Sequence, residues 1–277
     1  MVYIPVDVNE AIRRECRRRR YSERTIKTYI YCVTKFLRFS GKGLDKVSKK
    51  DVRLFLESLS EEGKAGNTMN VYHMAIRFLF EDVLDKRIWI DIKYSKIPEK
   101  LPVFLEKEEI KNLLNSIHNP THKLMVQFMY SAGLRVSELV NLKVGDMELD
   151  KNYGWVRKGK GNKDRLFIIA DSLKSELLQL VETKKVGDLV FSNNRGGEYS
   201  SKTLQEIIKL AAKTSKIKKK VSCHTLRHSF ATHLIQDGYS VSEVQTLLGH
   251  KSPETTFIYL HTASPTMIKI KSPLDNL

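Results

Sequence analysis

The residue types best suited to chemistry in this chain are arginine, lysine, histidine and tyrosine, spaced over residues 135–259. They are Arg135, Lys160, His224, Arg227, His250 and Tyr259. Arginine binds phosphate oxygens through paired N–H groups and keeps its charge at any working pH. A tyrosine oxygen is a nucleophile that forms covalent intermediates. The set therefore predicts a site that holds a phosphodiester while a tyrosine attacks it.

The arginine and histidine motifs also have plain structural interpretations. Arg135 follows a glycine turn among apolar residues, where an ion pair with Glu138 would explain it as well as phosphate binding does. His224 and His228 are one helical turn apart, as in a zinc-binding pair. A zinc site is disfavoured because the glutamate of the H-E-x-x-H motif and a nearby third ligand are both missing.

Three further residues are ordinary when each is taken alone. Lys160 is a hairpin lysine, His250 fits a histidine at a helix end, and Tyr259 is one of 11 tyrosines, most of which must be structural. The occurrence of all these residues in one order, rather than any single residue, supports the catalytic interpretation.

The charge of the chain also favours a phosphate-bearing partner. With 48 Lys+Arg against 32 Asp+Glu, its 277 residues carry a net charge of +16 and give a pI near 9.6. This excess favours nucleic acid over membrane, because no amphipathic basic anchor stands out; the alternative is a solubilising basic surface. The three cysteines are scattered and no secretory or membrane-spanning segment is apparent, so we expect a cytoplasmic protein.

Helical periodicity and a proline-containing linker predict two domains. Residues 1–95 are predicted to form a compact helical bundle, with helices at about 8–20, 22–41, 48–63 and 68–80. Residues 96–103, which include Pro98 and Pro102, are predicted to be a linker because proline restricts itself and the residue before it. Residues 104–277 are predicted to form the second domain and a C-terminal tail.

The second domain is predicted to be mainly helical with a small antiparallel sheet, an α+β fold. Helices are expected at about 121–132, 136–142, 172–183, 201–215 and 224–237. Residues 146–169 alternate with a period of two, which predicts the sheet, with Lys160 at a hairpin tip. Residues 189–191 are expected to add a third strand. Ser252 and Pro253 predict the start of a short helix that carries Tyr259.

The order Arg, Lys, His-x-x-Arg, Leu-Gly-His, Tyr resembles that of the tyrosine recombinase, or phage integrase, family. Within this family, residues 133–139, 159–163 and 224–232 are most similar to the Xer site-specific recombinases. The similarity is strong over about residues 105–262, whereas the N-terminal region matches only in size and helical character.

The resemblance implies a clamp around duplex DNA, formed by a helical core-binding domain and a catalytic domain. Tyr259 would attack the scissile phosphate and leave a 3′-phosphotyrosyl bond and a free 5′-hydroxyl. Arg135 and Arg227 would neutralise the non-bridging oxygens. Lys160 would protonate the departing 5′-oxygen. Neither a metal nor another cofactor is implied.

The same resemblance gives the histidines and the glutamate supporting roles. His224 and His250 would add hydrogen bonds where charge develops. His228 is expected to pack against the site or support it from behind, and Glu138 likewise.

The resemblance also implies an assembly and a biological outcome. Four protomers would join on two double-stranded DNA sites, with the tail at 262–277 docked on a neighbouring protomer; docking on its own domain is the alternative. The expected function is Xer-like resolution of chromosome or plasmid multimers. The alternatives are a mobile-element integrase, a type IB topoisomerase and a catalytically silent DNA-binding regulator.

Overall fold

The chain forms two compact units, Met1–Glu99 and Lys100–Leu277, in a computed structural model. The structure describes residues 7–86, 92–96, 101–157, 164–193, 196–249 and 255–260. Within these ranges, no helix has both the length and the apolar character that crossing a membrane requires. Each unit has its own hydrophobic core, so each is considered by itself.

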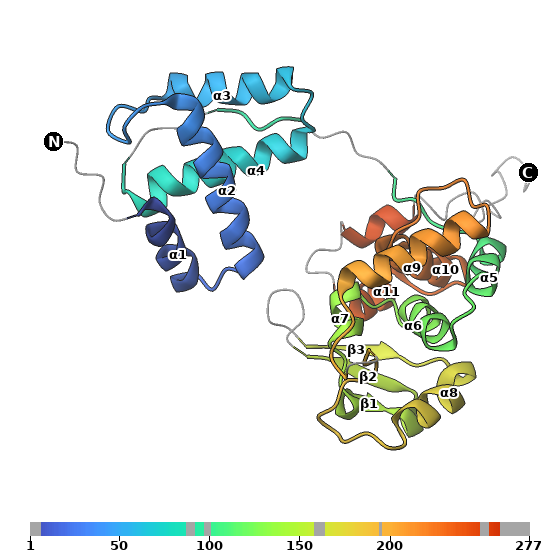
Figure 1. Ribbon diagram of the computed structural model, residues 1–277. Helices are drawn as coiled ribbons and strands as arrows, with labels where there is room; N and C mark the ends of the chain where they lie inside the picture. Colours follow the sequence, from blue (N-terminus) through green and yellow to red (C-terminus); the bar gives the residue numbers. More distant parts are fainter. Residues whose placement is uncertain are drawn as a thin grey trace, which may run out of the picture. The chain divides into compact units, whose positions relative to one another are not determined.

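The first unit is built from α-helices, the last of which continues as a short π-helix (Figure 1). The elements are α1 (Val8–Arg18), α2 (Glu23–Ser40), α3 (Lys49–Glu61), α4 (Gly66–Arg77) and the π-helix Phe78–Val83. Ser22 caps α2 by accepting a hydrogen bond from the backbone of Thr25. At the start of α3, Asp51 accepts hydrogen bonds from the backbone and the hydroxyl of Ser48. These caps place the helix starts where the sequence predicts them.

Aromatic side chains at helical spacing form the centre of the first core. Phe36 of α2 contacts Phe55 of α3 edge to face, with ring centroids 5.4 Å apart, and contacts Phe80 at 6.3 Å. All three side chains are buried. Burying one such ring contributes about 1.5–3 kcal/mol, so the apolar periodicity is sufficient to draw these helices together.

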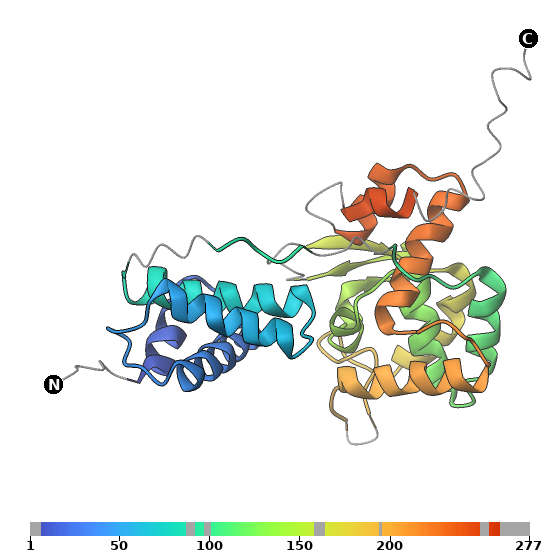
Figure 2. The same ribbon diagram turned by 90° about the horizontal axis from the view of Figure 1, so that it is seen from above.

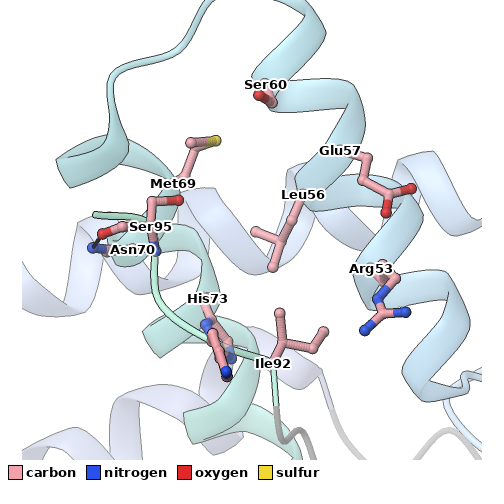
Figure 3. A pocket seen from close by; sticks show the side chains of 10 residues that line it. Arg53, Leu56, Glu57, Ser60, Met69, Asn70, His73, Ile92 and Ser95 are labelled. Atoms are coloured by element: carbon pink, nitrogen blue, oxygen red, sulfur yellow. Dashed lines mark hydrogen bonds between the residues drawn. The ribbon is translucent and has the colours of Figure 1, made fainter. Parts of the chain in front are cut away.

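Residues 92–96 run along α3 and α4, as the two perpendicular views show (Figures 1 and 2). The side-chain amide of Asn70 donates to the Ser95 carbonyl at 3.1 Å and accepts from the Ser95 N–H at 2.8 Å. The ring of His73 lies against Tyr94, with centroids 4.6 Å apart. A pocket lies between this segment and the two helices (Figure 3). It belongs to the first unit, whereas all the predicted catalytic residues belong to the second.

The second unit combines helices with a three-stranded antiparallel sheet of order β1-β2-β3 (Figure 1). The strands are β1 (Met147–Glu148), β2 (Tyr153–Val156) and β3 (Arg165–Ile168), with Trp155 opposite Leu166. The helices are α5 (Lys107–Asn115), α6 (Pro120–Ser131), α7 (Val136–Val140), α8 (Asp171–Val181), α9 (Ser201–Thr214), α10 (Cys223–Gln236) and α11 (Val241–Leu248). The predicted fold class, mainly α with a small antiparallel sheet, is confirmed.

Helix α10 lies at the centre of the second unit, in contact with α6, α9 and α11. Its buried side chains are both apolar, such as Leu226 and Ala231, and polar, such as Arg227 and Thr232. A helix buried on more than one side holds its side chains in fixed positions. The segment that carries His224 to His228 is therefore a rigid support for a site.

The predicted strand at residues 189–191 is wrong. Leu189 makes only an isolated bridge with Lys143, and the third strand of the sheet is β1. Val190 and Phe191 are buried in the hydrophobic core. A short apolar run is compatible with either a strand or a packed loop, and here packing alone accounts for it.

Candidate active site

Arg135 lies at the turn between α6 and α7, where its position depends on a glycine. Gly133 has a φ of +58°, and a Cβ there would come within 2.4 Å of the Phe230 ring, so no larger residue fits. Glu138 accepts hydrogen bonds from the backbone N–H of Arg135 at 2.8 Å and from its guanidinium at 2.6 Å. The ion pair with Glu138 is therefore present, and it fixes the direction of the Arg135 side chain.

Arg227 extends from α10 and is held by backbone carbonyls of two other segments. Its Nη1 donates to the carbonyl of Gly133 at 2.6 Å, and its Nη2 donates to the carbonyl of Leu248 at the end of α11. The carboxylate of Glu138 lies 3.8 Å from Nη1. The side chain of Arg227 therefore joins the Arg135 turn, α10 and the end of α11 in one site.

This cluster carries more positive than negative charge. Burial, followed by Arg135 and Arg165, lowers the pKa of Arg227 to about 9, which leaves it charged at neutral pH. Burial raises the pKa of Glu138, but Arg165 and then Arg135 outweigh it, so the pKa lies below the ordinary value. One carboxylate thus faces three guanidiniums, and a phosphate bound here would gain from the excess positive charge.

Arg165 is a site residue that the sequence analysis did not identify. Its Nη2 donates to Glu138 at 2.6 Å and its Nη1 donates to the carbonyl of Leu247, so it joins β3 to α7 and α11. β3 contacts α11 (Figure 2). A Cβ on Gly249, which has a φ of +62°, would come within 2.6 Å of the Arg165 side chain. The available signal was strand alternation, because Arg165 and Phe167 are the buried positions of β3.

Tyr259 lies in a helical segment, residues 255–260, as the sequence predicts. Its ring is only 2% exposed and packs in a cluster with Phe230 of α10 and Leu248 of α11. Its hydroxyl lies 2.9 Å from Nδ1 of His228. The imidazole of His224 is 6.4 Å from that of His228, between ring centroids, and His224 is exposed to solvent.

The surroundings of His228, His224 and Tyr259 disfavour the charged form of each side chain. Burial, then His224 and Arg227, lowers the pKa of His228 to about 4. Partial burial, then Arg227 and Arg135, lowers the pKa of His224. Burial raises the pKa of Tyr259, although Arg227 and Arg135 act in the opposite direction. Arg227 therefore acts electrostatically on the predicted nucleophile and on both histidines, and Arg135 acts on the nucleophile and on His224.

Two predicted residues, Lys160 and His250, lie outside the described residues. On either side of Lys160, β2 and β3 pair antiparallel, and Arg157 donates to Asp164 at 3.0 Å. Before His250, α11 ends at Gly249, a left-handed residue that is itself the C-cap. Of the described elements that flank these two residues, β3 and α11 contact each other, and Arg165 of β3 donates to the carbonyl of Leu247 in α11.

The other four predicted residues, Arg135, His224, Arg227 and Tyr259, are all in the described part of the chain and occupy one site. Among the residues that the structure describes, no three His, Cys, Asp or Glu side chains are grouped to hold a metal ion. The described side chains of the site are guanidiniums, imidazoles, the Glu138 carboxylate and a buried phenol. Such a set suits binding of a phosphodiester and attack by an oxygen nucleophile.

Comparisons with known proteins agree on one family. The family model described as "Phage integrase family" matches residues 103–265, and "Phage integrase, N-terminal SAM-like domain" matches residues 9–90. A tyrosine recombinase of Thermosipho africanus is 36% identical over 258 residues, which are 88% of this chain and 91% of the relative. Tyrosine recombinase XerA of Pyrococcus horikoshii is 35% identical, covering 86% of this chain and 83% of XerA.

Solved structures give the same result. The crystal structure of XerA recombinase, 30% identical, matches 96% of this chain and 100% of its own with a TM-score of 0.56. XerH recombinase bound to palindromic difH substrate in a post-cleavage complex, 25% identical, matches 95% and 83% of the two chains with a TM-score of 0.72. The chain belongs to the phage integrase, or tyrosine recombinase, family.

Proposed function

We propose that the protein is a site-specific recombinase that cuts and rejoins duplex DNA through a covalent bond to Tyr259. The observation that carries the proposal is the meeting of Tyr259 with the helix that bears Arg227, beside the turn that bears Arg135. A buried tyrosine hydroxyl next to two fixed guanidiniums is suited to attack on a phosphodiester. The DNA-bound form of the related XerH recombinase supports duplex DNA as the substrate.

In the proposed reaction, the guanidiniums of Arg135 and Arg227 bind the non-bridging oxygens of the scissile phosphate. The oxygen of Tyr259 forms a bond to phosphorus as the bond from phosphorus to the 5′-oxygen breaks, which leaves a 3′-phosphotyrosyl link. Lys160 gives a proton to the departing oxygen, and the exposed His224 donates a hydrogen bond to the phosphate. The energy of the ester is kept in the covalent link, so attack by a 5′-hydroxyl of a second strand completes the exchange. His250 has the same proposed role as His224.

The biological outcome that we favour is Xer-like resolution of chromosome or plasmid multimers by four protomers on two DNA sites. Relatives named XerA and XerD support this outcome. The solved tetramer of lambda integrase on a Holliday junction has a similar fold, which supports a tetramer here.

The tail at 262–277, proposed to dock on a neighbouring protomer, lies outside the described residues. Integrases named among the relatives, such as one from Escherichia coli at 30% identity, favour insertion of mobile DNA as the second candidate.

The test is covalent trapping on a nicked DNA site. Tyr259→Phe should bind DNA with unchanged affinity and form no covalent adduct, because only the attacking oxygen is lost. Tyr239→Phe is the matched control, since Tyr239 is an exposed tyrosine near α11 and should leave adduct formation intact. An adduct that persists in Tyr259→Phe, mapped by mass spectrometry to another residue, would refute the assignment. A circular DNA that carries two sites separates strand exchange from topoisomerase action. A recombinase gives recombinant circles, whereas a topoisomerase gives relaxed circles only.

A further inference from the structure

His228 has no role in the reaction described so far, yet it lies within hydrogen-bond distance of the predicted nucleophile. It follows Arg227 on α10, and its Nδ1 lies 2.9 Å from the hydroxyl oxygen of Tyr259. The two rings are 5.6 Å apart between centroids. This contact joins residues that are 31 positions apart in the chain. It places an imidazole nitrogen at the oxygen that must lose its proton.

The surroundings of His228 determine which of the two groups holds the proton. His224 and Arg227, on the same helix, face it, and Tyr259 faces it from the segment 255–260. Burial, then His224 and the Arg227 guanidinium, lower the pKa of the imidazole, while burial raises the pKa of the phenol. A phenol O–H is then the donor and an unprotonated imidazole nitrogen the acceptor, with the other ring nitrogen carrying hydrogen.

We propose that His228 accepts the proton of Tyr259 as the tyrosine oxygen attacks the scissile phosphorus. This inference rests on the proposed function of Tyr259. The proton moves from the phenol oxygen to Nδ1 while the oxygen–phosphorus bond forms and the bond to the 5′-oxygen breaks. During rejoining, the same imidazolium returns the proton to the departing tyrosine oxygen. His224, which is exposed, keeps its proposed role at the phosphate.

The arginine cluster provides a reason why this base would act only on bound DNA. Without phosphate, burial, then His224 and the positive charge of Arg227, lower the pKa of His228. A phosphate between Arg135 and Arg227 offsets that charge and makes protonation of His228 easier. The tyrosine is therefore activated when its target arrives and remains an unreactive phenol otherwise.

The experiment measures single-turnover cleavage of a nicked site by variants of His228 across a range of pH. His228→Asn places an amide oxygen near the position of Nδ1, so it keeps a hydrogen-bond acceptor but cannot take a proton. We expect His228→Asn and His228→Ala to slow cleavage about 100-fold or more, with the adduct still on Tyr259. The wild-type rate should fall at acid pH with a slope of one, and this fall should vanish in both variants.

A second imidazole–tyrosine pair on the same helix provides the matched control. Nδ1 of His233 lies 2.8 Å from the hydroxyl of Tyr130, and the charged groups that affect its pKa are Lys107 and Asp237 rather than the arginines. His233→Asn should disturb α10 to a similar extent but leave the cleavage rate and its pH profile unchanged. Cleavage by His228→Asn at the wild-type rate would overturn the proposal and leave His228 a positioning residue.

A measurement on the unaltered protein avoids dependence on variants that fold poorly. Nitrogen-15 NMR of the histidine side chains should show Nδ1 of His228 without hydrogen at neutral pH. Protonated Nδ1 would overturn the proposal even if the variants are slow. The two proposals fail differently: an adduct in Tyr259→Phe contradicts the nucleophile, whereas normal cleavage by His228→Asn contradicts only the base.

Discussion

Two glutamates, one in each unit, each form ion pairs with two arginines, but one cluster is exposed to solvent and the other is buried. Glu15 in the first unit binds Arg18 at 2.5 Å and Arg19 at 2.7 Å, and those arginine side chains are 70% and 32% exposed. Glu138 in the second unit binds Arg135 and Arg165, each at 2.6 Å, and those side chains are 20% and 7% exposed. The first cluster is solvated, whereas the second lies inside the protein.

The difference shows where this chain tolerates the cost of burying charge. Exposed ion pairs contribute little to stability, and buried ones often contribute less than apolar residues of equal volume would. Stability alone therefore does not explain three guanidiniums around Glu138. The phosphate-binding role proposed for this site would explain them, because Glu138 and backbone carbonyls hold the guanidiniums in place without a substrate.

The strongest test of this comparison removes each carboxylate. Glu138→Gln should lower the free energy of unfolding of the second unit by about 3–5 kcal/mol, because it leaves buried guanidiniums without their counter-charge. Glu15→Gln, the matched change in the first unit, should have a much smaller effect because its arginines are solvated. Urea unfolding, followed unit by unit with pulsed hydrogen exchange and mass spectrometry, measures both. Equal losses in the two units would contradict the distinction between solvated and buried clusters.

The loss of stability in acid should also differ between the buried site, where His228 titrates, and the exposed Glu15 cluster. His228 has a folded pKa of about 4 against an ordinary 6.5, so the unfolded chain binds a proton that the folded chain does not. Stability is fully present above pH 6.5 and falls as the pH drops towards 4, by up to about 3 kcal/mol. The pKa of Glu15 is lowered from 4.5 to about 2, so its contribution to stability is lost only as the pH falls from 4.5 to about 2.

Hydrogen exchange read over this pH range in each unit measures the two losses. His228→Asn should flatten the loss between pH 6.5 and 4 in the second unit, whereas Glu15→Gln should change the first unit only below about pH 4.5. An unchanged acid response in His228→Asn would show that its imidazole is not held neutral by the fold.

The smallest expected difference in the free energy of unfolding is between two glycines that have the same backbone conformation. Gly41 has a φ of +60°, and a Cβ added there would have no neighbour within 4 Å, whereas at Gly249, φ +62°, the Cβ would meet Arg165 at 2.6 Å. Gly41→Ala should cost about 1–2 kcal/mol for the left-handed conformation alone. Gly249→Ala should cost about 1–3 kcal/mol more, because Glu138 and the carbonyl of Leu247 hold Arg165 in place.

A double-mutant cycle with Arg165→Ala assigns that excess. If Arg165 causes it, Gly249→Ala in the Arg165→Ala background should cost no more than Gly41→Ala in the intact chain. The free energies of unfolding come from the same urea experiment. If the extra loss of stability in Gly249→Ala persists after Arg165 is removed, its cause is a contact other than Arg165.

Local patterns were sufficient for most of the fold. Helical periodicity and capping residues such as Ser22 and Ser48 predicted the helices of the first unit, and period-two alternation predicted the paired strands β2 and β3. The expected strand at 189–191 failed because burial of Val190 and Phe191 is a property of their surroundings, which a short apolar run does not reveal.

Periodicity, caps and the order of the motifs can all be read along the chain, so they were enough to predict the kinds of elements, the family and the residues suited to phosphate chemistry. Which of those side chains meet depends on the tertiary fold. Arg165 reaches Glu138 across 27 positions, and His228 reaches Tyr259 across 31. Such contacts, and the pKa shifts that they cause, depend on the packing of α7, α10, α11 and β3 against one another. Distance and burial, rather than residue type, decide whether an arginine is a solvated surface charge or part of a phosphate site.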